Sequence, residues 1–286
     1  MHTNLIILAG GASSRMKNSS ATANLSEVEI QEANSQSKAL IGVGNDSRPI
    51  LDYLLINAEK AGYKNVYLVI GENGDSFMKY YGNKKENNHF RTMQLFYATQ
   101  YIPKGRTKPF GTSDALLQAL EQYPKLQKQT FTVCNSDNLY SVAALKSLRI
   151  NTDSNAFISY DRDGLEFSMV RISRFALAVL DTENYLIDII EKPSVEETTK
   201  YKDEKGKLRV SMNIFKLNGN DIYPYLENCP VNPDREEKEL PTAILNLCKT
   251  LPKALKGIPF NEHVPDLTSK EDIEILKKYI EDHFSE

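Results

Sequence analysis

The chain has 286 residues, with 35 lysines and arginines against 38 aspartates and glutamates, so its formal net charge is −3. This balance argues against sequence-independent binding of nucleic acid, which usually needs a clearly basic surface. Hydrophobic residues make up 41% of the chain, too many for a disordered protein. No apolar run is long enough for a transmembrane helix, and the N-terminal run is too short for a secretory signal. We therefore expect a cytoplasmic globular protein without nucleic-acid or membrane partners.

Cysteine and histidine give no sign of a disulfide framework or a zinc site. The three cysteines are odd in number and widely spaced, and no Cys-x-x-Cys pair occurs. The four histidines are scattered and form no metal-ligand pattern.

The first half of the chain alternates between predicted strands and helices. Residues 4–8 form a continuous apolar run that ends at two glycines, which predicts a strand buried on both faces. Residues 17–37 are polar, with almost no large apolar side chains, which predicts a long mobile loop. Apolar periodicity then predicts helices at residues 50–61, 75–81, 112–122 and 141–149, and strands at residues 65–70, 92–97 and 130–134.

The second half is richer in predicted strands. They lie at residues 156–160, 168–172, 176–180, 186–190 and 209–217, with a charged loop at residues 194–207. Helices are predicted at residues 221–226, 237–249 and 270–283, the last with Ser269 as its cap. The alternation in the first half predicts an α/β fold built on a mostly parallel, doubly wound sheet.

The most distinctive motif directly follows the first predicted strand. Residues 8–16 read Leu-Ala-Gly-Gly-Ala-Ser-Ser-Arg-Met. Glycines let the backbone approach a phosphate closely, and free N–H groups can bind the anion. The Walker loop is excluded because no Gly-Lys-Ser/Thr follows. The dinucleotide fingerprint is excluded because Ala12 and Arg15 stand where it needs glycine. A tight turn without a ligand is the alternative for Gly10 and Gly11.

This motif resembles the signature of the nucleotidyltransferases, the family that includes sugar-1-phosphate nucleotidylyltransferases and the molybdenum-cofactor guanylyltransferase. The resemblance implies a Rossmann-like three-layer sandwich with a mostly parallel mixed sheet. It implies a single domain, residues 1–286, in which residues 1–150 bind nucleotide and residues 151–286 form a sugar-side lobe and C-terminal helix. Further segments match in the family's order and extend the resemblance over nearly the whole chain: Ser37-Lys38-Ala39-Leu40, Arg48-Pro49-Ile50-Leu51, Phe110-Gly111-Thr112-Ser113, Asn135-Ser136-Asp137, Glu191-Lys192-Pro193, and Pro265-Asp266 with Asp272.

The resemblance implies that Arg15, Lys38 and Asp137 are catalytic residues. Arg15 is always charged, can hold phosphate oxygens in a fork, and would stabilise the leaving pyrophosphate. Lys38 would neutralise charge at the transferred phosphate. The simpler alternatives are that Arg15 and Lys38 face water as surface residues and that Asp137 caps the following helix.

A magnesium site is expected at Asp137. This residue follows an apolar strand, and ligands of α/β sheets gather beyond the carboxyl ends of strands. Mg²⁺ takes one or two carboxylates plus substrate phosphates. The resemblance implies Asp266 as the second ligand, although Thr268 and Ser269 stand where the family usually has Gly-Thr. A polar loop before a helix cap is the alternative for Asp266, because the sequence alone does not show that the two aspartates meet.

The resemblance also implies one site for an NTP and one for a phosphorylated acceptor. Lys192 would reach the sugar phosphate and Glu191 would accept hydrogen bonds from sugar hydroxyls; an exposed charged strand end is the alternative. Asn213 stands where a glycine is frequent, so we expect a narrower or more polar acceptor pocket. The residues expected to contact the nucleotide are Leu8, Ala9, Gly10, Gly11, Gly111, Thr112 and Ser113.

We therefore predict a Mg²⁺-dependent enzyme that moves a nucleoside monophosphate from an NTP to a sugar-1-phosphate or similar acceptor and releases pyrophosphate. One alternative is a glycosyltransferase of the same architecture, whose usual Asp-x-Asp motif would correspond to Asn135-Ser136-Asp137. The other is a non-catalytic nucleotide-binding module, which would tolerate the loss of Arg15, Lys38 and Asp137, yet all three are present. The sequence leaves the base, the acceptor and the oligomeric state open.

Overall fold

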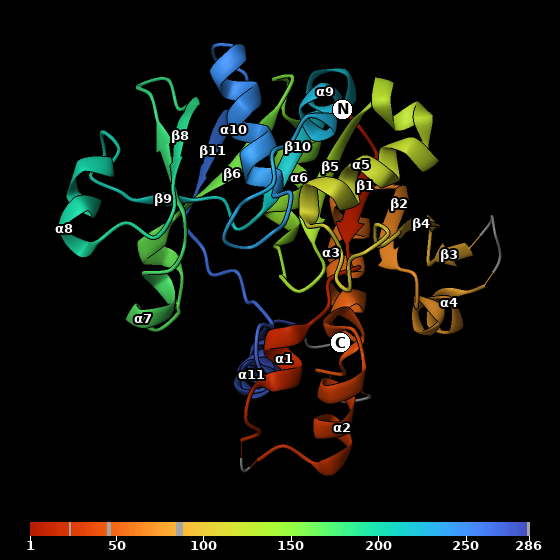
Figure 1. Cartoon of the computed structure of the whole chain (residues 1–286). Coiled ribbons are helices and arrows are strands. Elements are labelled where there is room, and N and C mark those ends of the chain that lie inside the picture. Colours follow the sequence, from red (N-terminus) through yellow and green to blue (C-terminus); the bar gives the residue numbers. More distant parts are fainter. Residues whose placement is uncertain (23, 45–46, 84–87, 285–286) are drawn as a thin grey trace.

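A computed structural model describes residues 1–22, 24–44, 47–83 and 88–284. Its central feature is a mixed, mostly parallel sheet (Figure 1) with the strand order β11-β6-β10-β5-β1-β2-β4-β3, to which β9 adds by pairing with β6. The strands described are β1 (Asn4–Leu8), β2 (Asn65–Gly71), β3 (Asn88–Phe90), β4 (Met93–Gln100), β5 (Thr130–Asn135), β6 (Ala156–Asp161), β9 (Arg209–Val210), β10 (Ile214–Asn218) and β11 (Lys256–Phe260).

Parallel pairing brings the carboxyl ends of the central strands to one edge of the sheet. β1 lies between β2 and β5 and is parallel to both, and β4 continues the parallel set beyond β2. β10 enters antiparallel between β5 and β6, and β11 pairs in parallel with β6 on its other side. The α/β fold with a mostly parallel mixed sheet is thereby confirmed.

Helices cover both faces of the sheet and explain the uninterrupted apolar run in β1. Leu5 and Ile7 belong to the hydrophobic cluster that includes α3 (Ile50–Ala61) and α6 (Val142–Ile150). Ile6 belongs to a second cluster with α5 (Thr112–Gln122), α9 (Gly219–Glu227) and α10 (Leu240–Thr250) on the opposite face. Because successive side chains of a strand point to opposite faces, a strand between two helical layers must be apolar throughout.

Several smaller elements surround this core. A separate two-stranded sheet consists of β7 (Leu177–Leu180) and β8 (Leu186–Ile190). The short helices are α1 (Ser14–Asn18), α2 (Glu27–Ser35), α4 (Asp75–Tyr81), α7 (Met169–Ile172) and α8 (Val195–Thr198), and the chain closes with α11 (Glu271–His283). Within the described ranges, no helix combines the length and the apolar character that crossing a membrane requires.

The prediction of a mobile loop over residues 17–37 was wrong. This segment contains the end of α1 and the whole of α2, and it packs with α11 in a lobe beside the sheet (Figure 1). Leu25 and Ala33 are buried in the main hydrophobic cluster, and polar contacts add to them. Ser26 and Glu29 form a capping box on α2, and Glu29 also pairs with Lys277 of α11. The capping box is a local Ser-x-x-Glu pattern that the prediction overlooked, whereas the contact with α11 comes from a residue far away in the sequence.

Three further elements differ from the prediction. The strand expected at residues 168–172 is the helix α7, because the Ser168 hydroxyl caps this helix by accepting a hydrogen bond from the Arg171 N–H. The single strand expected at residues 209–217 is split into β9 and β10, because Met212 and Asn213 both adopt left-handed backbone conformations. The charged loop at residues 194–207 includes α8, which begins with another capping box.

Candidate active site

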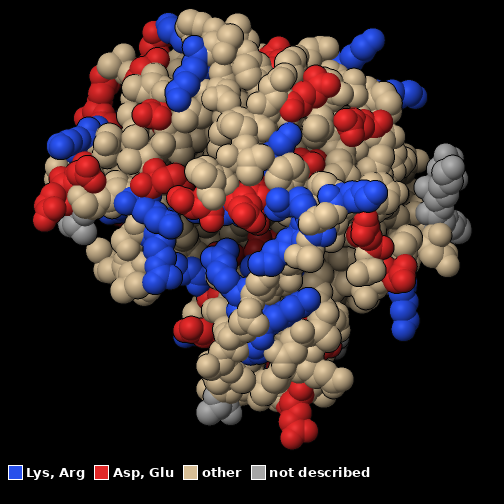
Figure 2. Space-filling model, viewed as in Figure 1, with Lys and Arg blue, Asp and Glu red and all other residues tan. Residues whose placement is uncertain are grey.

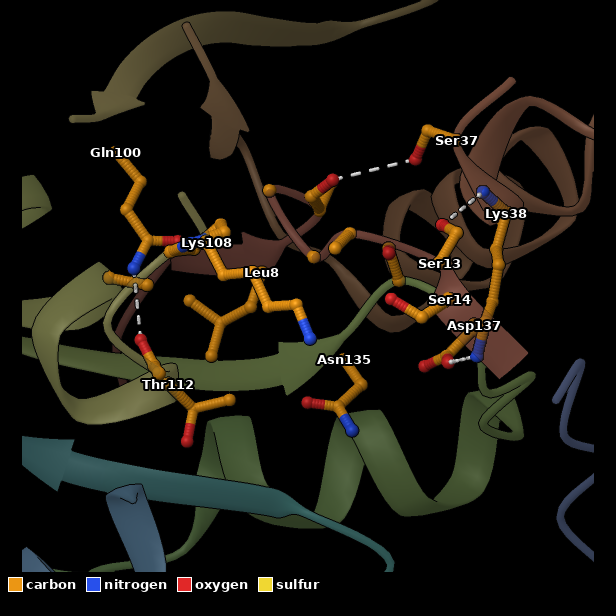
Figure 3. A pocket seen from close by; sticks show the side chains of 18 of the residues that line it. Leu8, Ser13, Ser14, Ser37, Lys38, Gln100, Lys108, Thr112, Asn135 and Asp137 are labelled. Carbon is orange, nitrogen blue, oxygen red and sulfur yellow. Dashed lines mark hydrogen bonds and ion pairs between the residues drawn. The ribbon is translucent and has the colours of Figure 1, made fainter. Parts of the chain in front are cut away.

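A cavity of about 350 Å³ lies at the carboxyl edge of the central strands. It is lined by residues that follow β1 and β5, by the end of β4 and by the start of α5. Figure 3 shows Lys38 and Asp137 directed toward each other at one end of this cavity, with Gln100 and Thr112 at the other. The strand order predicts a site at this edge, since ligands of α/β sheets bind beyond the carboxyl ends of strands.

The glycine motif after β1 forms one wall of the cavity. A Cβ on Gly10 would lie 3.2 Å from Gln100 Oε1 and 3.3 Å from the Gly71 nitrogen, so a larger residue would press on the neighbouring strands. Gly11 lines the same cavity, and a Cβ there would meet nothing within 4 Å. Ser13 adopts a left-handed conformation directly before α1 and accepts a hydrogen bond from the Lys38 N–H. The result is an open, glycine-lined backbone wall of the kind that can approach a phosphate.

Lys38 and Asp137 form an ion pair inside the cavity. The distance from Lys38 Nζ to Asp137 Oδ2 is 2.9 Å. Lys38 begins a short 3₁₀ turn after α2, and Asp137 follows β5, so the pair links two segments of the first half of the chain. Both side chains are largely shielded from water, which strengthens their interactions with other charges. A phosphate can compete with Asp137 for the Lys38 ammonium group, and a cation can compete with Lys38 for the Asp137 carboxylate.

Asp266 lies beside Asp137 although the two are far apart in sequence. The backbone around them pairs as a short antiparallel bridge: Leu139 N–H donates to the Pro265 carbonyl at 2.9 Å, and Leu267 N–H donates to the Asp137 carbonyl at 2.8 Å. Burial, and then the negative charge of Asp137, raise the pKa of the Asp266 carboxyl. The structure therefore brings the two predicted metal ligands together.

Arg171 is the counter-charge of Asp266. Its guanidinium lies 2.8 Å from Asp266 Oδ2 and also pairs with Asp272. The Thr268 hydroxyl donates a further hydrogen bond to Asp266 Oδ2 at 2.8 Å. These partners lower the pKa of Asp266 but do not offset burial and the charge of Asp137. A carboxylate whose pKa is raised by burial and by a neighbouring carboxylate fits a donor set for Mg²⁺.

No larger cluster of metal ligands is found elsewhere in the described parts of the chain. A group of three or more His, Cys, Asp or Glu side chains that could hold a metal does not occur there. Asp137 and Asp266 therefore stay the predicted ligands of a divalent cation, with substrate phosphates as its further ligands.

The start of α5 forms the far end of the cavity. Gly111 has φ 100° and ψ −179°, a conformation that is essentially restricted to glycine, and its carbonyl accepts a hydrogen bond from Gln100 Nε2 at 3.0 Å. Gly111 is the N-cap of α5, and the Thr112 hydroxyl accepts a hydrogen bond from the Leu240 N–H instead of capping the helix. Both residues line the cavity, whereas Ser113 is fully buried and lies outside the lining.

A second cavity of about 390 Å³ adjoins the first and contains the predicted acceptor residues Glu191 and Asn213. Glu191 lies 3.8 Å from Arg235. Lys192 is exposed and does not belong to the described lining of either cavity. The two cavities share the side chains of Arg15, Thr112, Asn135, Asp137 and Glu237.

Arg15 is placed at this junction by α1. Its side chain is exposed and lines both cavities, together with Asp137. Figure 2 shows that Lys and Arg side chains gather around a hollow in this face of the molecule, with acidic side chains along its rim. The two linings carry acidic side chains as well as basic ones, so the attraction for anionic ligands rests on single cations such as Arg15, Lys38 and Lys108.

The sequence analysis missed several residues of the site. Gln100 was excluded because the strand was predicted to end three residues earlier, and Lys108 carried no motif. Arg171 was assigned to a strand, so its link to Asp266 was not foreseen. Arg174 and Arg235 line the second cavity and come from segments with irregular structure, which leave no periodic signal.

The chain is similar to known proteins over most of its length. A family model described as nucleotidyl transferase matches residues 4–250. The bifunctional protein GlmU of Methanocaldococcus jannaschii is 24% identical over 235 residues, which are 82% of this chain and 47% of that protein. GlmU of Methanococcus maripaludis is 26% identical over 227 residues, 79% of this chain and 45% of that protein. The chain therefore spans about half the length of these curated relatives.

Among solved structures, the fold is similar to that of a UDP-glucose pyrophosphorylase complexed with UDP-glucose. The TM-score is 0.70 at 16% sequence identity, and the match covers 99% of both chains. At this identity the likeness shows the fold alone.

Proposed function

The chain belongs to the nucleotidyl transferase family, and on this premise we propose that it transfers a nucleoside monophosphate from an NTP to a sugar-1-phosphate or a similar phosphorylated acceptor. The observation that carries the proposal is that Arg15 and Asp137 lie where two adjoining cavities share a wall, with Asp266 beside Asp137 in the lining of the second cavity. One cavity offers a glycine-lined backbone for the NTP, and the other offers room for the acceptor. Transfer between two anionic substrates needs this arrangement of charge between two sites.

The reaction requires little covalent chemistry from the protein. A phosphate oxygen of the acceptor attacks the α-phosphorus of the NTP in line. The new P–O bond forms as the bond from the α-phosphorus to the bridging oxygen breaks, and pyrophosphate leaves with that electron pair. We assign Arg15 to the leaving pyrophosphate, because its forked guanidinium matches phosphate oxygens. We assign Lys38 to the transferred phosphate, which would compete with Asp137 for its ammonium group.

Asp137 and Asp266 would hold Mg²⁺. When bound, the cation would supply positive charge for the phosphates. Arg171 and Thr268 keep the Asp266 carboxylate oriented by hydrogen bonds. The remaining assignments concern binding: the nucleotide would lie along residues 8–11 and the Gly111 segment, and the acceptor would lie near Glu191 and Asn213. The role of Lys192 on the acceptor phosphate stays a prediction, because its side chain lies outside both described linings.

We also propose that residues 1–286 act as one domain. The antiparallel pairing of β10 with β5 supports this, because it inserts a strand of the second half into the sheet of the first half. Residues 1–150 would then supply most of the nucleotide site and residues 151–286 most of the acceptor site.

The experiment is a pyrophosphate-release assay with the four NTPs against a panel of sugar-1-phosphates in the presence of Mg²⁺. We expect release with at least one pair, and a loss of about a hundredfold or more in Arg15→Met. Arg91→Met is the matched control, because Arg91 is an exposed arginine that lies outside both cavities and pairs with Glu59. It should retain full activity.

Two outcomes would contradict the proposal. The first is the absence of release with every pair although the protein is folded. The second is transfer of a sugar from a nucleotide sugar with release of a nucleoside diphosphate, which would identify a glycosyltransferase.

A further inference from the structure

Lys270 is a buried lysine whose charged end reaches the back of α1. Its side chain is only 3% exposed, and it lies at the start of α11, far from α1 in the sequence. The ammonium group donates hydrogen bonds to the carbonyls of Met16 at 2.9 Å, Lys17 at 3.2 Å and Ser19 at 2.6 Å. A lysine has three N–H donors, so these three carbonyls use them all.

These contacts supply what α1 lacks on its own. The helix has five residues, too few to be stable in isolation, and its last carbonyls have no partner within the helix. A cation at the carboxyl end of a helix also interacts favourably with the helix dipole. In addition, the Lys270 N–H donates to the Ser19 hydroxyl at 3.0 Å. Together with the fully buried Met16, Lys270 therefore fixes the back of α1 to the C-terminal segment.

The N-terminal end of α1 lines the two cavities. Ser13, Ser14 and Arg15 line the first cavity, and Arg15 also lines the second. Arg15 is followed directly by Met16, whose carbonyl is one of those held by Lys270. A displacement of this short helix would move the Arg15 guanidinium with it.

Lys270 is also linked to Asp266 by a hydrogen-bonded turn. Asp272 accepts hydrogen bonds from the N–H groups of Thr268 at 2.9 Å and Ser269 at 2.7 Å, and it pairs with Arg171. Arg171 in turn holds Asp266. The turn at residues 266–272 thus contains both Asp266 and Lys270, the residue that holds α1.

We propose that Lys270 is a positioning residue. It holds Arg15 toward the pyrophosphate part of the substrate and in a fixed position relative to Asp266. This inference rests on the proposed function. Lys270 lies beyond the residues matched by the family model, which end at residue 250. It touches no cavity itself within the described linings, so its effect on the substrate must pass through α1.

The test is a double-mutant cycle read by calorimetric titration of inorganic pyrophosphate in the presence of Mg²⁺. It compares the wild type, Lys270→Met, Arg15→Met and the double variant. Each single variant should bind pyrophosphate about tenfold more weakly, the loss of one hydrogen-bonded charge contact. The double variant should bind no more weakly than Arg15→Met alone, because Lys270 acts through Arg15.

Lys277→Met is the matched control. Lys277 lies on the same helix as the Lys270 anchor but pairs with Glu29 of α2, so this variant removes a lobe contact without touching α1. Its pyrophosphate affinity should equal that of the wild type. Lys270→Gln, which keeps two amide donors, replaces Lys270→Met in the cycle if the latter does not fold.

The results separate this inference from the proposed function. Wild-type protein that binds no pyrophosphate would overturn both. If the wild type binds but the Lys270 variant binds equally well, only the role of Lys270 is refuted. The role is also refuted if the two losses multiply in the double variant, which indicates independent effects, or if neither Lys270 variant folds, which makes Lys270 a residue for folding alone.

Discussion

Gly111 offers a direct test of how the nucleotide end of the cavity is built. A Cβ at this position would lie 2.4 Å from the Lys238 carbonyl oxygen and 2.9 Å from the Lys238 nitrogen, both of them backbone atoms. The same stretch is held by two backbone hydrogen bonds, from Lys238 N–H to the Phe110 carbonyl at 2.8 Å and from Ser113 N–H to the Lys238 carbonyl at 2.9 Å. Gly111→Ala must therefore push the two segments apart.

The expected loss of stability follows from two contributions. The backbone conformation of Gly111 costs any other residue about 1–3 kcal/mol. Weakening the two hydrogen bonds to Lys238 adds about 1 kcal/mol each. Gly111→Ala should therefore lower the free energy of unfolding by about 3–5 kcal/mol, which corresponds to a fall of about 10 °C in Tm for a chain of this size.

The assay is urea and thermal unfolding of Gly111→Ala beside a matched control, Gly105→Ala. Gly105 also has a positive φ, 87°, but a Cβ there would meet nothing within 4 Å. The control pays only the left-handed penalty of about 1–2 kcal/mol. Equal losses in the two variants would refute the argument, because they would show that the contact with Lys238 does not restrict residue 111.

Three further predictions concern charge and the phosphate wall. The pKa of His2 is lowered to about 3, first by burial and then by the charge of Lys216. Its contribution is therefore present above the ordinary histidine pKa and is lost as the pH falls, by about 1.4 kcal/mol per pH unit down to about pH 3. His2→Gln should flatten that slope in urea titrations between pH 7 and 4, and an unchanged slope would contradict the burial argument. Gly11→Ala should leave the free energy of unfolding within about 0.5 kcal/mol of the wild type but weaken NTP binding measured by calorimetry, because the new methyl group enters open cavity space; unaltered binding would exclude a phosphate at this wall. Asp137→Asn should abolish the Mg²⁺ dependence of NTP binding in thermal-shift titrations and lower the free energy of unfolding by about 1–3 kcal/mol, since it removes the counter-charge of the largely shielded Lys38; retained Mg²⁺ dependence would refute the metal assignment.

Local patterns predicted the layers of the fold well. The run at residues 4–8 gave the central strand, and the apolar faces of residues 50–61 and 112–122 gave the two helices that cover its opposite sides. Period and length are local properties, and burial on both faces follows from them. The position of the glycine motif and of Asp137 at strand ends then followed from the parallel topology, which sets all such ends on one edge.

Contacts between distant segments explain what the sequence did not reveal. The segment at residues 17–37 is ordered by partners such as Lys270 and Lys277, which lie about 250 positions later. The approach of Asp266 to Asp137 depends on backbone pairing across about half that interval, so only the resemblance to a family suggested it. Arg171 was unforeseen because a serine cap turned the expected strand into a helix.

The central claim is the transfer of a nucleoside monophosphate. The most direct measurement follows isotopic labels in parallel reactions with Mg²⁺, a sugar-1-phosphate and an NTP labelled at the α- or the γ-phosphorus. We predict that the α label appears in a nucleoside diphosphate sugar and the γ label in pyrophosphate, and that both products are lost in Arg15→Met. The claim is contradicted if the γ label appears as inorganic phosphate while the α label stays in a free nucleoside diphosphate.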